Sequence, residues 1–300
     1  MILSYMRFIR IEHAECETRN ELFLEDSQKE RDYVKEGEMT QEERRIWLID
    51  YLRSESDDLK EMGIPGDEQG QRNMLRALMN IREAKPIGED FLKIQDDYLT
   101  WETGKRGIID AGEMSYFGKN SRIYLWQGDI TRLKCDAIVN AANSKMRGCF
   151  IPLHDCIDNR IHSRAGVQLR IRCDEIMRKQ GHDEPAGSAK VTPAYNLPCE
   201  QIIHVAGPVV EYEIEDEHIK QLRQCYITCL EVAKLYEMDS IALCSISTGE
   251  NKFTMEESAR IAIDTVMEYI REHDRPKQII FTVEDDEALE IYTHLLSKVC

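Results

Sequence analysis

Short apolar runs alternate with longer helical segments through the last two thirds of the chain, and this alternation constrains the fold more than any other feature. Continuously apolar runs are typical of strands that are buried on both faces of a sheet. We predict strands within RIYLWQGDI, CDAIVNAAN, EQIIHVAGP, DSIALCSIS and KQIIFTVED. Apolar residues recur at helical spacing in 217–238, 256–272 and 286–298. Strands that alternate with helices predict a three-layer α/β sandwich with a largely parallel sheet.

The first third of the chain has a different pattern. Residues 1–39 are polar and mixed in charge, and we interpret them as a polar N-terminal extension. Residues 40–110 carry three amphipathic segments, of which the first starts with Thr40 as a helix cap and Glu43 three residues later. They predict a helical accessory domain that serves as a scaffold or interaction element, with no residue placed for chemistry. Residues 111–300 would then form the α/β domain.

The length and charge of the chain exclude several classes of function. Three hundred residues exceed one average domain, and a net charge of -17 disfavours nucleic acid and membrane surfaces as partners. No apolar run is as long as the roughly 18 residues of a membrane helix. Arg7 and Arg10 interrupt the apolar stretch that a signal peptide would need. We therefore expect a cytoplasmic protein, with a monomer as the default state.

The ten cysteines show no disulfide framework, and most lie within apolar patterns that predict buried, reduced thiols. Only Cys149 and Cys156 have a histidine, His154, between them at a spacing typical of metal ligands. Two thiolates and one imidazole suit zinc, and three protein ligands leave a fourth position open. The spacing alone leaves a second interpretation open, which is two buried cysteines beside an exposed histidine.

Polar loops follow three of the predicted strands, at the edge where open α/β sheets bind ligands. Asp129 follows the first strand, and Asn140 and Asn143 follow the second. The small-residue segment 247–253 lies between the fourth strand and a helix, where backbone amides and the helix dipole can bind phosphate. Each loop also has a plain structural interpretation as a turn, a cap or a connection.

The segments GDIT, DAIVNAAN, CIDNRIHSRAG, GSAKVTPAYNLPCEQIIHVAGP and SISTG occur in one order, and together they resemble the macrodomain family over residues 120–298. The resemblance implies an α/β/α sandwich with a mixed sheet that binds ADP-ribose. It implies that Asp129 holds the adenine amine, that Ile130 adds a backbone contact, and that Asn140 and Asn143 line the distal ribose. The residues that would wrap the diphosphate and distal ribose, largely through backbone amides, are Ser247, Thr248, Gly249, Glu250, Asn251 and Phe253.

The stretch GCFIPLHDCIDNRIH replaces the glycine run of most macrodomains and resembles the zinc-containing microbial branch of the family. The signature of that branch is Cys, four residues, His, one residue, Cys, and Cys149, His154 and Cys156 match it. The resemblance implies one Zn²⁺ per chain and a distal-ribose site at Ile157 and Asp158. Members of this branch resemble hydrolases that remove mono-ADP-ribose from proteins, and some act against lipoyl-carrier modification systems. The helical segment 40–105 also resembles the N-terminal extension of that branch.

These features predict a zinc-dependent hydrolase that removes mono-ADP-ribose from Asp- or Glu-linked protein, with Asp158 and Asn143 as catalytic candidates. Asp158 would bind a ribose hydroxyl or act as a base on water, and its alternative role is a helix cap. His162 and His204 are expected to be structural. The alternative functions are a non-catalytic ADP-ribose-binding module and an O-acetyl-ADP-ribose deacetylase. A purely structural zinc clip is disfavoured because a fourth ligand is missing.

The loop STGENKFT departs from the family pattern at three positions. Asn251 stands where many relatives have an aromatic residue, Lys252 where many have glycine, and Thr254 where proline is common. Lys252 adopts a positive φ less readily than glycine, although it can add positive charge near the diphosphate. Loss of the aromatic residue predicts weaker stacking over the distal ribose.

Overall fold

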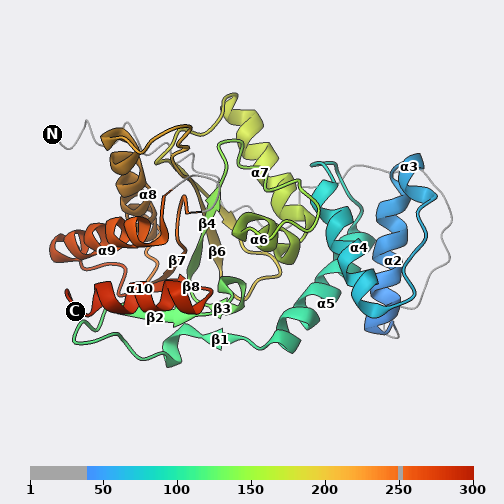
Figure 1. Cartoon of the computed structure of the whole chain (residues 1–300). Coiled ribbons are helices and arrows are strands. Elements are labelled where there is room, and N and C mark those ends of the chain that lie inside the picture. The colour runs from blue at the N-terminus through green and yellow to red at the C-terminus, as the bar shows by residue number, and fades with distance from the viewer. Residues whose placement is uncertain (1–38, 249–252) are drawn as a thin grey trace.

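The computed structural model of the chain describes residues 39–248 and 253–300 (Figure 1). A group of helices comes first in the chain and lies at one end of the molecule, beside a larger α/β sandwich. This helical group consists of α2 (Gln41–Ser54), α3 (Asp57–Lys60), α4 (Glu68–Ile81) and α5 (Glu89–Arg106). Thr40 and Glu43 form the predicted capping box at the start of α2. The short helix α3 was not predicted.

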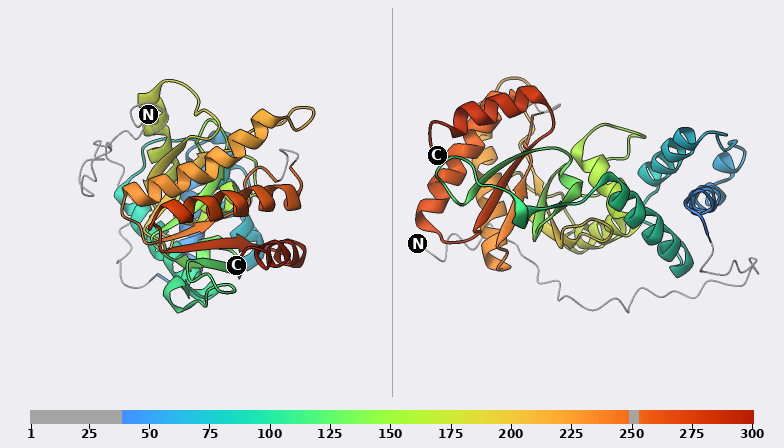
Figure 2. Two further views of the ribbon diagram at one scale, coloured as in Figure 1. Left: turned by 90° about the vertical axis from the view of Figure 1, so that its left-hand side faces the viewer. Right: turned by 90° about the horizontal axis from the view of Figure 1, so that it is seen from below.

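The helical group has its own apolar core. Leu48 of α2, Leu75 of α4 and Phe91 of α5 are buried together in it, and Val167 from the sandwich joins them. Because Val167 is the first residue of α7 (Val167–Gln180), the shared core fixes the helical group against the sandwich. The right-hand view in Figure 2 shows the helical group beside the sandwich.

A six-stranded mixed sheet forms the centre of the sandwich, with strand order β2-β8-β7-β4-β6-β5. Its strands are β2 (Ile123–Gln127), β4 (Ala137–Ala142), β5 (Ala189–Pro193), β6 (Gln201–Ala206), β7 (Ser240–Leu243) and β8 (Gln278–Val283). All neighbours are parallel except β5 and β6, which are antiparallel. A separate ladder pairs β1 (Ile109–Asp110) with β3 (Leu133–Lys134). The predicted mixed, largely parallel sheet is confirmed.

The edge strand β5 was not predicted, because it has no apolar run. Its buried positions are the polar residues Lys190 and Thr192. Lys190 forms an ion pair of 3.1 Å with the buried Glu184, which compensates the burial of its charge. A strand whose inward side chains are polar cannot be recognised from hydrophobic periodicity.

Helices cover both faces of the sheet, which completes the three-layer sandwich. On one side lie α6 (Ile157–Ala165) and α7, and on the other lie α8 (Asp216–Leu235), α9 (Met255–Glu272) and α10 (Asp286–Leu296) (Figure 1). Two short 3-10 turns, η1 (Ala111–Glu113) and η2 (Ile130–Arg132), lie before and after β2. The three predicted helices of the sandwich are present as α8, α9 and α10. The first and last end sooner than predicted, at Leu235 and Leu296.

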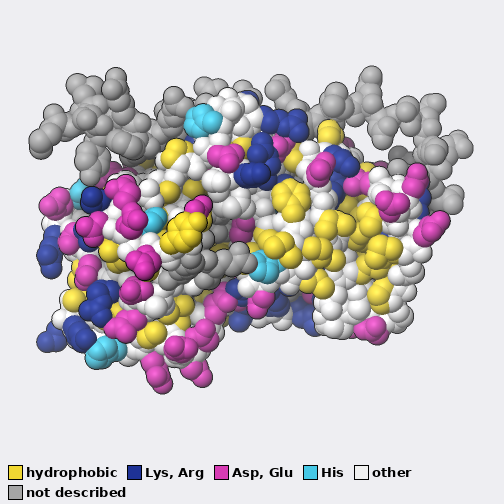
Figure 3. Space-filling view, turned by 45° about the horizontal axis from the view of Figure 1, so that its top comes forward, with side chains coloured by type: hydrophobic (Ala, Val, Ile, Leu, Met, Phe, Trp, Pro, Cys, Tyr) yellow, Lys and Arg dark blue, Asp and Glu magenta, His cyan; other side chains and the backbone are white. Residues whose placement is uncertain are grey.

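The parallel strands place the loops that follow β2, β4 and β7 at one edge of the sheet. Acidic side chains are spread over much of the face shown in Figure 3, in keeping with the net charge of -17. Within 39–248 and 253–300, no helix combines the length and the apolar character that crossing a bilayer requires.

Candidate functional site

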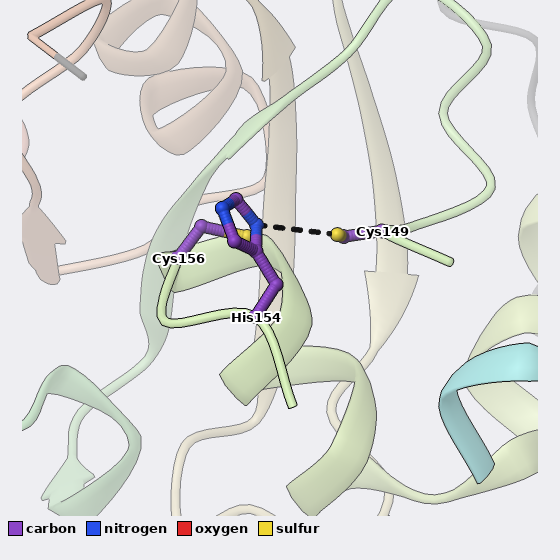
Figure 4. A group of neighbouring side chains, drawn as sticks. All are labelled: Cys149, His154 and Cys156. Atoms are coloured by element: carbon purple, nitrogen blue, oxygen red, sulfur yellow. Dashed lines mark hydrogen bonds between the residues drawn. The ribbon is translucent and has the colours of Figure 1, made fainter. Parts of the chain in front are cut away.

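The loop between β4 and α6 brings two cysteines and a histidine together, and we call residues 148–156 the metal loop. The thiol Sγ of Cys149 lies 3.5 Å from Nδ1 of His154. One donor atom each from Cys149, His154 and Cys156 lies within 4.8 Å of the other two. Figure 4 shows the imidazole between the two thiols, with Cys156 at the start of α6. The three residues that the sequence singled out therefore meet in space.

This donor set fits a single metal ion. Zinc bonds of about 2.3 Å to sulfur and about 2.1 Å to nitrogen place two tetrahedral donors roughly 3.5 Å apart, which matches the Cys149–His154 distance. Burial raises the pKa of the Cys156 thiol to about 11, against the opposing hydrogen bond from the Asn159 amide, and the neighbouring Cys149 adds to the rise. A raised pKa keeps the Cys156 thiol protonated at neutral pH, so binding of a metal ion there would release its proton.

Cys156 also has a structural role, because it caps α6. Its Sγ accepts a hydrogen bond of 3.3 Å from the backbone N–H of Asn159. The alternative interpretation of Asp158 as the helix cap is therefore wrong, and its carboxylate is left for other contacts.

Asp158 is buried directly behind the metal loop. Its Oδ1 accepts a hydrogen bond of 2.8 Å from Nδ2 of Asn140, which lies within β4 and not after it as predicted. Burial raises the pKa of the Asp158 carboxyl to about 6, while the Asn140 hydrogen bond and the charge of Arg170 lower it. A carboxyl group with such a pKa is ionised at neutral pH but accepts a proton readily, which suits general base catalysis.

The two asparagines after the second predicted strand occupy different environments. Asn140 is fully buried, and its Nδ2 lies within 3.0 Å of His204 Nδ1 as well as contacting Asp158. Asn143 is exposed. Its side-chain amide donates a hydrogen bond of 3.4 Å to the carbonyl of Gly148, and its Oδ1 accepts one from the backbone N–H of Lys145. Asn140 therefore supports Asp158, and Asn143 joins the end of β4 to the metal loop. Their contacts with the distal ribose stay predictions.

The predicted adenine site lies at η2. Asp129 caps this turn through Thr131, and its second carboxylate oxygen pairs with Arg164 of α6. Ile130 is buried. An adenine amine would share the Asp129 carboxylate with Arg164, a partner that the sequence did not indicate.

The predicted phosphate loop is described only at its ends, because Gly249, Glu250 and Asn251 lie outside the described residues, as does Lys252. Ser247 has a φ of 61° and donates its hydroxyl to the carbonyl of Pro208, so its side chain is already used. Thr248 is half-buried and Phe253 is buried. Thr254 caps α9 in a capping box with Glu257.

A second group of cysteine and histidine side chains, formed by His162, Cys173 and His204, lies in the core near Asp158. Its potential ligand atoms are also within 4.8 Å of one another. His204 uses both ring nitrogens, because Nδ1 lies 3.0 Å from Asn140 Nδ2 and Nε2 lies 2.9 Å from Thr192 Oγ1. Both histidines are buried, as expected of structural residues.

The helical region contacts the metal loop, which the sequence did not predict. Arg76 and Asn80 of α4 hydrogen-bond to the backbone of the metal loop, at His154 and Leu153. Because these contacts join residues more than 70 positions apart, no local pattern in the sequence signals them. The buried Arg170 of α7 also contacts the loop, at the carbonyl of Cys149.

Known proteins are similar to the chain over most of its length. The family model described as Macro domain matches residues 139–262. A protein named protein-ADP-ribose hydrolase from Treponema medium is 46% identical over 263 residues, which are 86% of this chain and 100% of the relative. The chain belongs to the macrodomain family.

A second relative and a solved structure agree with the assignment of this macrodomain to its family. A protein-ADP-ribose hydrolase from Staphylococcus aureus is 39% identical over 256 residues, covering 85% of this chain and 96% of the relative. Among solved structures, a macrodomain from Oceanobacillus iheyensis with ADP is 30% identical with a TM-score of 0.55. That match covers 61% of this chain and 94% of the other. The predicted family and sandwich fold are confirmed.

Proposed function

We propose that this macrodomain protein is a zinc-dependent hydrolase that removes mono-ADP-ribose from aspartate- or glutamate-linked protein side chains. The observation that carries the proposal is the convergence of Cys149, His154 and Cys156 in front of the buried carboxylate of Asp158. The similar proteins from Treponema medium and Staphylococcus aureus are named protein-ADP-ribose hydrolases, which supports the reaction class.

Cys149, His154 and Cys156 would hold the zinc ion. A zinc ion held there would supply Lewis-acid polarisation of a ribose hydroxyl or a water. A structural site would be closed by a fourth protein ligand. Among the described residues, the Cys149 group has three such donors, which favours the catalytic interpretation.

Asp158 would act on the water that attacks C1″ of the distal ribose. Asn140 holds one carboxylate oxygen, so the other can accept the proton of the water. The bond between C1″ and the acceptor carboxylate breaks, the water oxygen becomes the new hydroxyl of ADP-ribose, and the Asp or Glu carboxylate leaves with the bonding electrons. The proton then passes from Asp158 to solvent. Asn143 would orient the distal ribose from the exposed end of β4.

The metal loop presents apolar side chains to solvent. Phe150, Ile151 and Leu153 are 40%, 56% and 41% exposed. We infer that they face the modified protein around its ADP-ribosylated side chain, while ADP-ribose lies along the edge of the sheet. A lipoyl-carrier protein is one substrate to test, because the zinc-containing branch that the sequence resembles includes members from such systems.

The test is release of ADP-ribose from a purified protein that carries mono-ADP-ribose on aspartate or glutamate. Untreated enzyme, chelator-treated enzyme and Cys149→Ala are compared, and ADP-ribose affinity and zinc content are measured in parallel. We expect release only with metal present. Tight ADP-ribose binding without release in the zinc-loaded enzyme would identify a binding module instead, and release of acetate from O-acetyl-ADP-ribose alone would identify a deacetylase.

A further inference from the structure

The C-terminal half of α4 lies against the metal loop and α6, although it belongs to the helical group (Figure 1). Arg76 and Asn80 are four residues apart and therefore lie on one face of this helix. Both side chains leave the helical group and end in the sandwich. Within the same helix, Arg72 instead pairs with Glu68 and Glu102 of the helical group.

Arg76 contacts the metal loop at two points. Its Nη2 donates a hydrogen bond of 2.8 Å to the carbonyl of His154, one of the three candidate ligands. The same guanidinium donates two hydrogen bonds, of 3.2 and 2.8 Å, to Oδ1 of Asn159. Asn159 is fully buried, donates its backbone N–H to Cys156 Sγ, and donates its side-chain amide to the carbonyl of Ile151. One guanidinium therefore restrains the backbone of one ligand directly and the sulfur of another through Asn159.

Asn80 restrains the middle of the loop. Its Oδ1 accepts a hydrogen bond of 3.0 Å from the backbone N–H of Leu153, immediately before His154. Leu153 has a φ of 58°, a conformation that a branched side chain adopts only when its surroundings impose it. The side-chain amide of Asn80 donates 2.8 Å to Ser163 of α6. Asn80 thus connects the strained residue of the loop to the helix behind it.

Arg170 connects the other end of the loop to α4. Its guanidinium is buried. It donates a hydrogen bond of 2.9 Å to the carbonyl of Arg147 and one of 3.1 Å to the carbonyl of Cys149. The same group donates to three carbonyls at the C-terminal end of α4, those of Met79, Asn80 and Arg82. A cation at that end of a helix satisfies carbonyls that have no partner within the helix. The loop is therefore attached to α4 on both sides of its ligands.

We propose that α4 is a brace for the metal loop, with Arg76 and Asn80 as positioning residues that hold Cys149, His154 and Cys156 together before a metal ion binds. This inference rests on the proposed zinc-dependent function. A free loop would lose conformational freedom when it closes around an ion, and hydrogen bonds that fix the ligands in advance remove that loss. The helical group would then be a part of the active site in this enzyme.

The experiment compares Arg76→Met with Arg72→Met in the full chain. Both variants remove an arginine from α4, but Arg72 pairs within the helical group and Arg76 contacts the metal loop. Zinc affinity is measured by competition with a chromophoric chelator, and Co²⁺ binding by the thiolate-to-cobalt absorption. We expect Arg76→Met to lower zinc affinity by about tenfold or more and to alter the cobalt spectrum, as loss of a residue that orients a ligand does. Arg72→Met should leave both unchanged.

Arg76→Lys keeps one donor for the His154 carbonyl and loses the forked contact with Asn159, so it should recover part of the affinity. ADP-ribose affinity should stay at the wild-type value in all three variants, which shows that the sandwich is folded. Equal zinc affinity in Arg76→Met and the wild type, or an equal loss in Arg72→Met, overturns the brace while the zinc-dependent function stands. A wild-type protein that binds neither ion overturns both.

Discussion

Two groups of cysteine and histidine side chains lie within the same domain, each with its potential ligand atoms within 4.8 Å of one another, but they differ in burial and in hydrogen bonding. Cys149, His154 and Cys156 are half-buried on a loop, whereas His162, Cys173 and His204 are buried in the core. In the core group, His204 is hydrogen-bonded at both nitrogens. In the loop group, the donors face one another with room for an ion. The two groups therefore differ in burial and in the hydrogen bonds of their donors, which favours the loop group as the candidate metal site.

The largest difference should appear when one cysteine of each group is replaced. Cys149→Ala removes a ligand, and we expect turnover to fall by at least about 100-fold together with loss of zinc. Cys173→Ala should keep zinc and turnover and lower only the free energy of unfolding. Metal analysis and ADP-ribose release measure the first two, and urea unfolding the third. Loss of zinc from Cys173→Ala would contradict the comparison.

Asp158 lies between the two groups, with His162 Nε2 at 3.5 Å from its Oδ1. Asp158→Asn keeps the hydrogen bond from Asn140 but cannot accept a proton, so we expect turnover to fall by about 100-fold with zinc retained. Asp155→Asn is the matched control, because this neighbouring carboxylate is 91% exposed. Unchanged turnover in Asp158→Asn would remove it from the mechanism.

Gly148 is where the backbone of the metal loop passes over the core group. It has a φ of 80°, and a Cβ there would lie 2.8 Å from the ring of His162. We expect Gly148→Ala to lower the free energy of unfolding by about 3 kcal/mol and to weaken zinc binding.

Gly181→Ala is the control for this substitution, because Gly181 has a similar φ of 78° with open space around a Cβ. It should lose only about 1 kcal/mol and bind zinc normally. An equal loss in both variants would show that the contact with His162 is unimportant.

The smallest effect concerns the pH dependence of stability. Burial lowers the pKa of His204 to about 3, below the value of about 6.5 expected in the unfolded chain. The unfolded chain therefore takes up a proton first as the pH falls, and stability present above about pH 6.5 is lost toward pH 3. By pH 5 the loss should be about 2 kcal/mol. Urea unfolding of the wild type and His204→Gln at pH 7 and pH 5 should show a smaller decrease in the variant.

Hydrophobic periodicity was sufficient to predict five strands of the sheet, and it failed where burial involves polar groups. The strand β5 directs Lys190 and Thr192 inward, and its partner Glu184 lies before it in the chain. The order and spacing of the sequence motifs were sufficient to single out the metal loop and Asp158. It did not reveal that Arg164 already pairs with Asp129, because that contact crosses from α6 to η2.

The sequence by itself determined the family and the order of five strands of the sheet, and it predicted the ligand set Cys149, His154 and Cys156, because these depend on residues close together in the chain. Only the tertiary structure decided that Asn140 contacts Asp158, that His204 is hydrogen-bonded at both ring nitrogens, and that Arg76 and Asn80 contact the metal loop. These properties arise from burial and from hydrogen bonds between distant segments. Neither has a local pattern, since a polar residue looks the same in the sequence whether it is solvated or bonded to a partner 78 positions away.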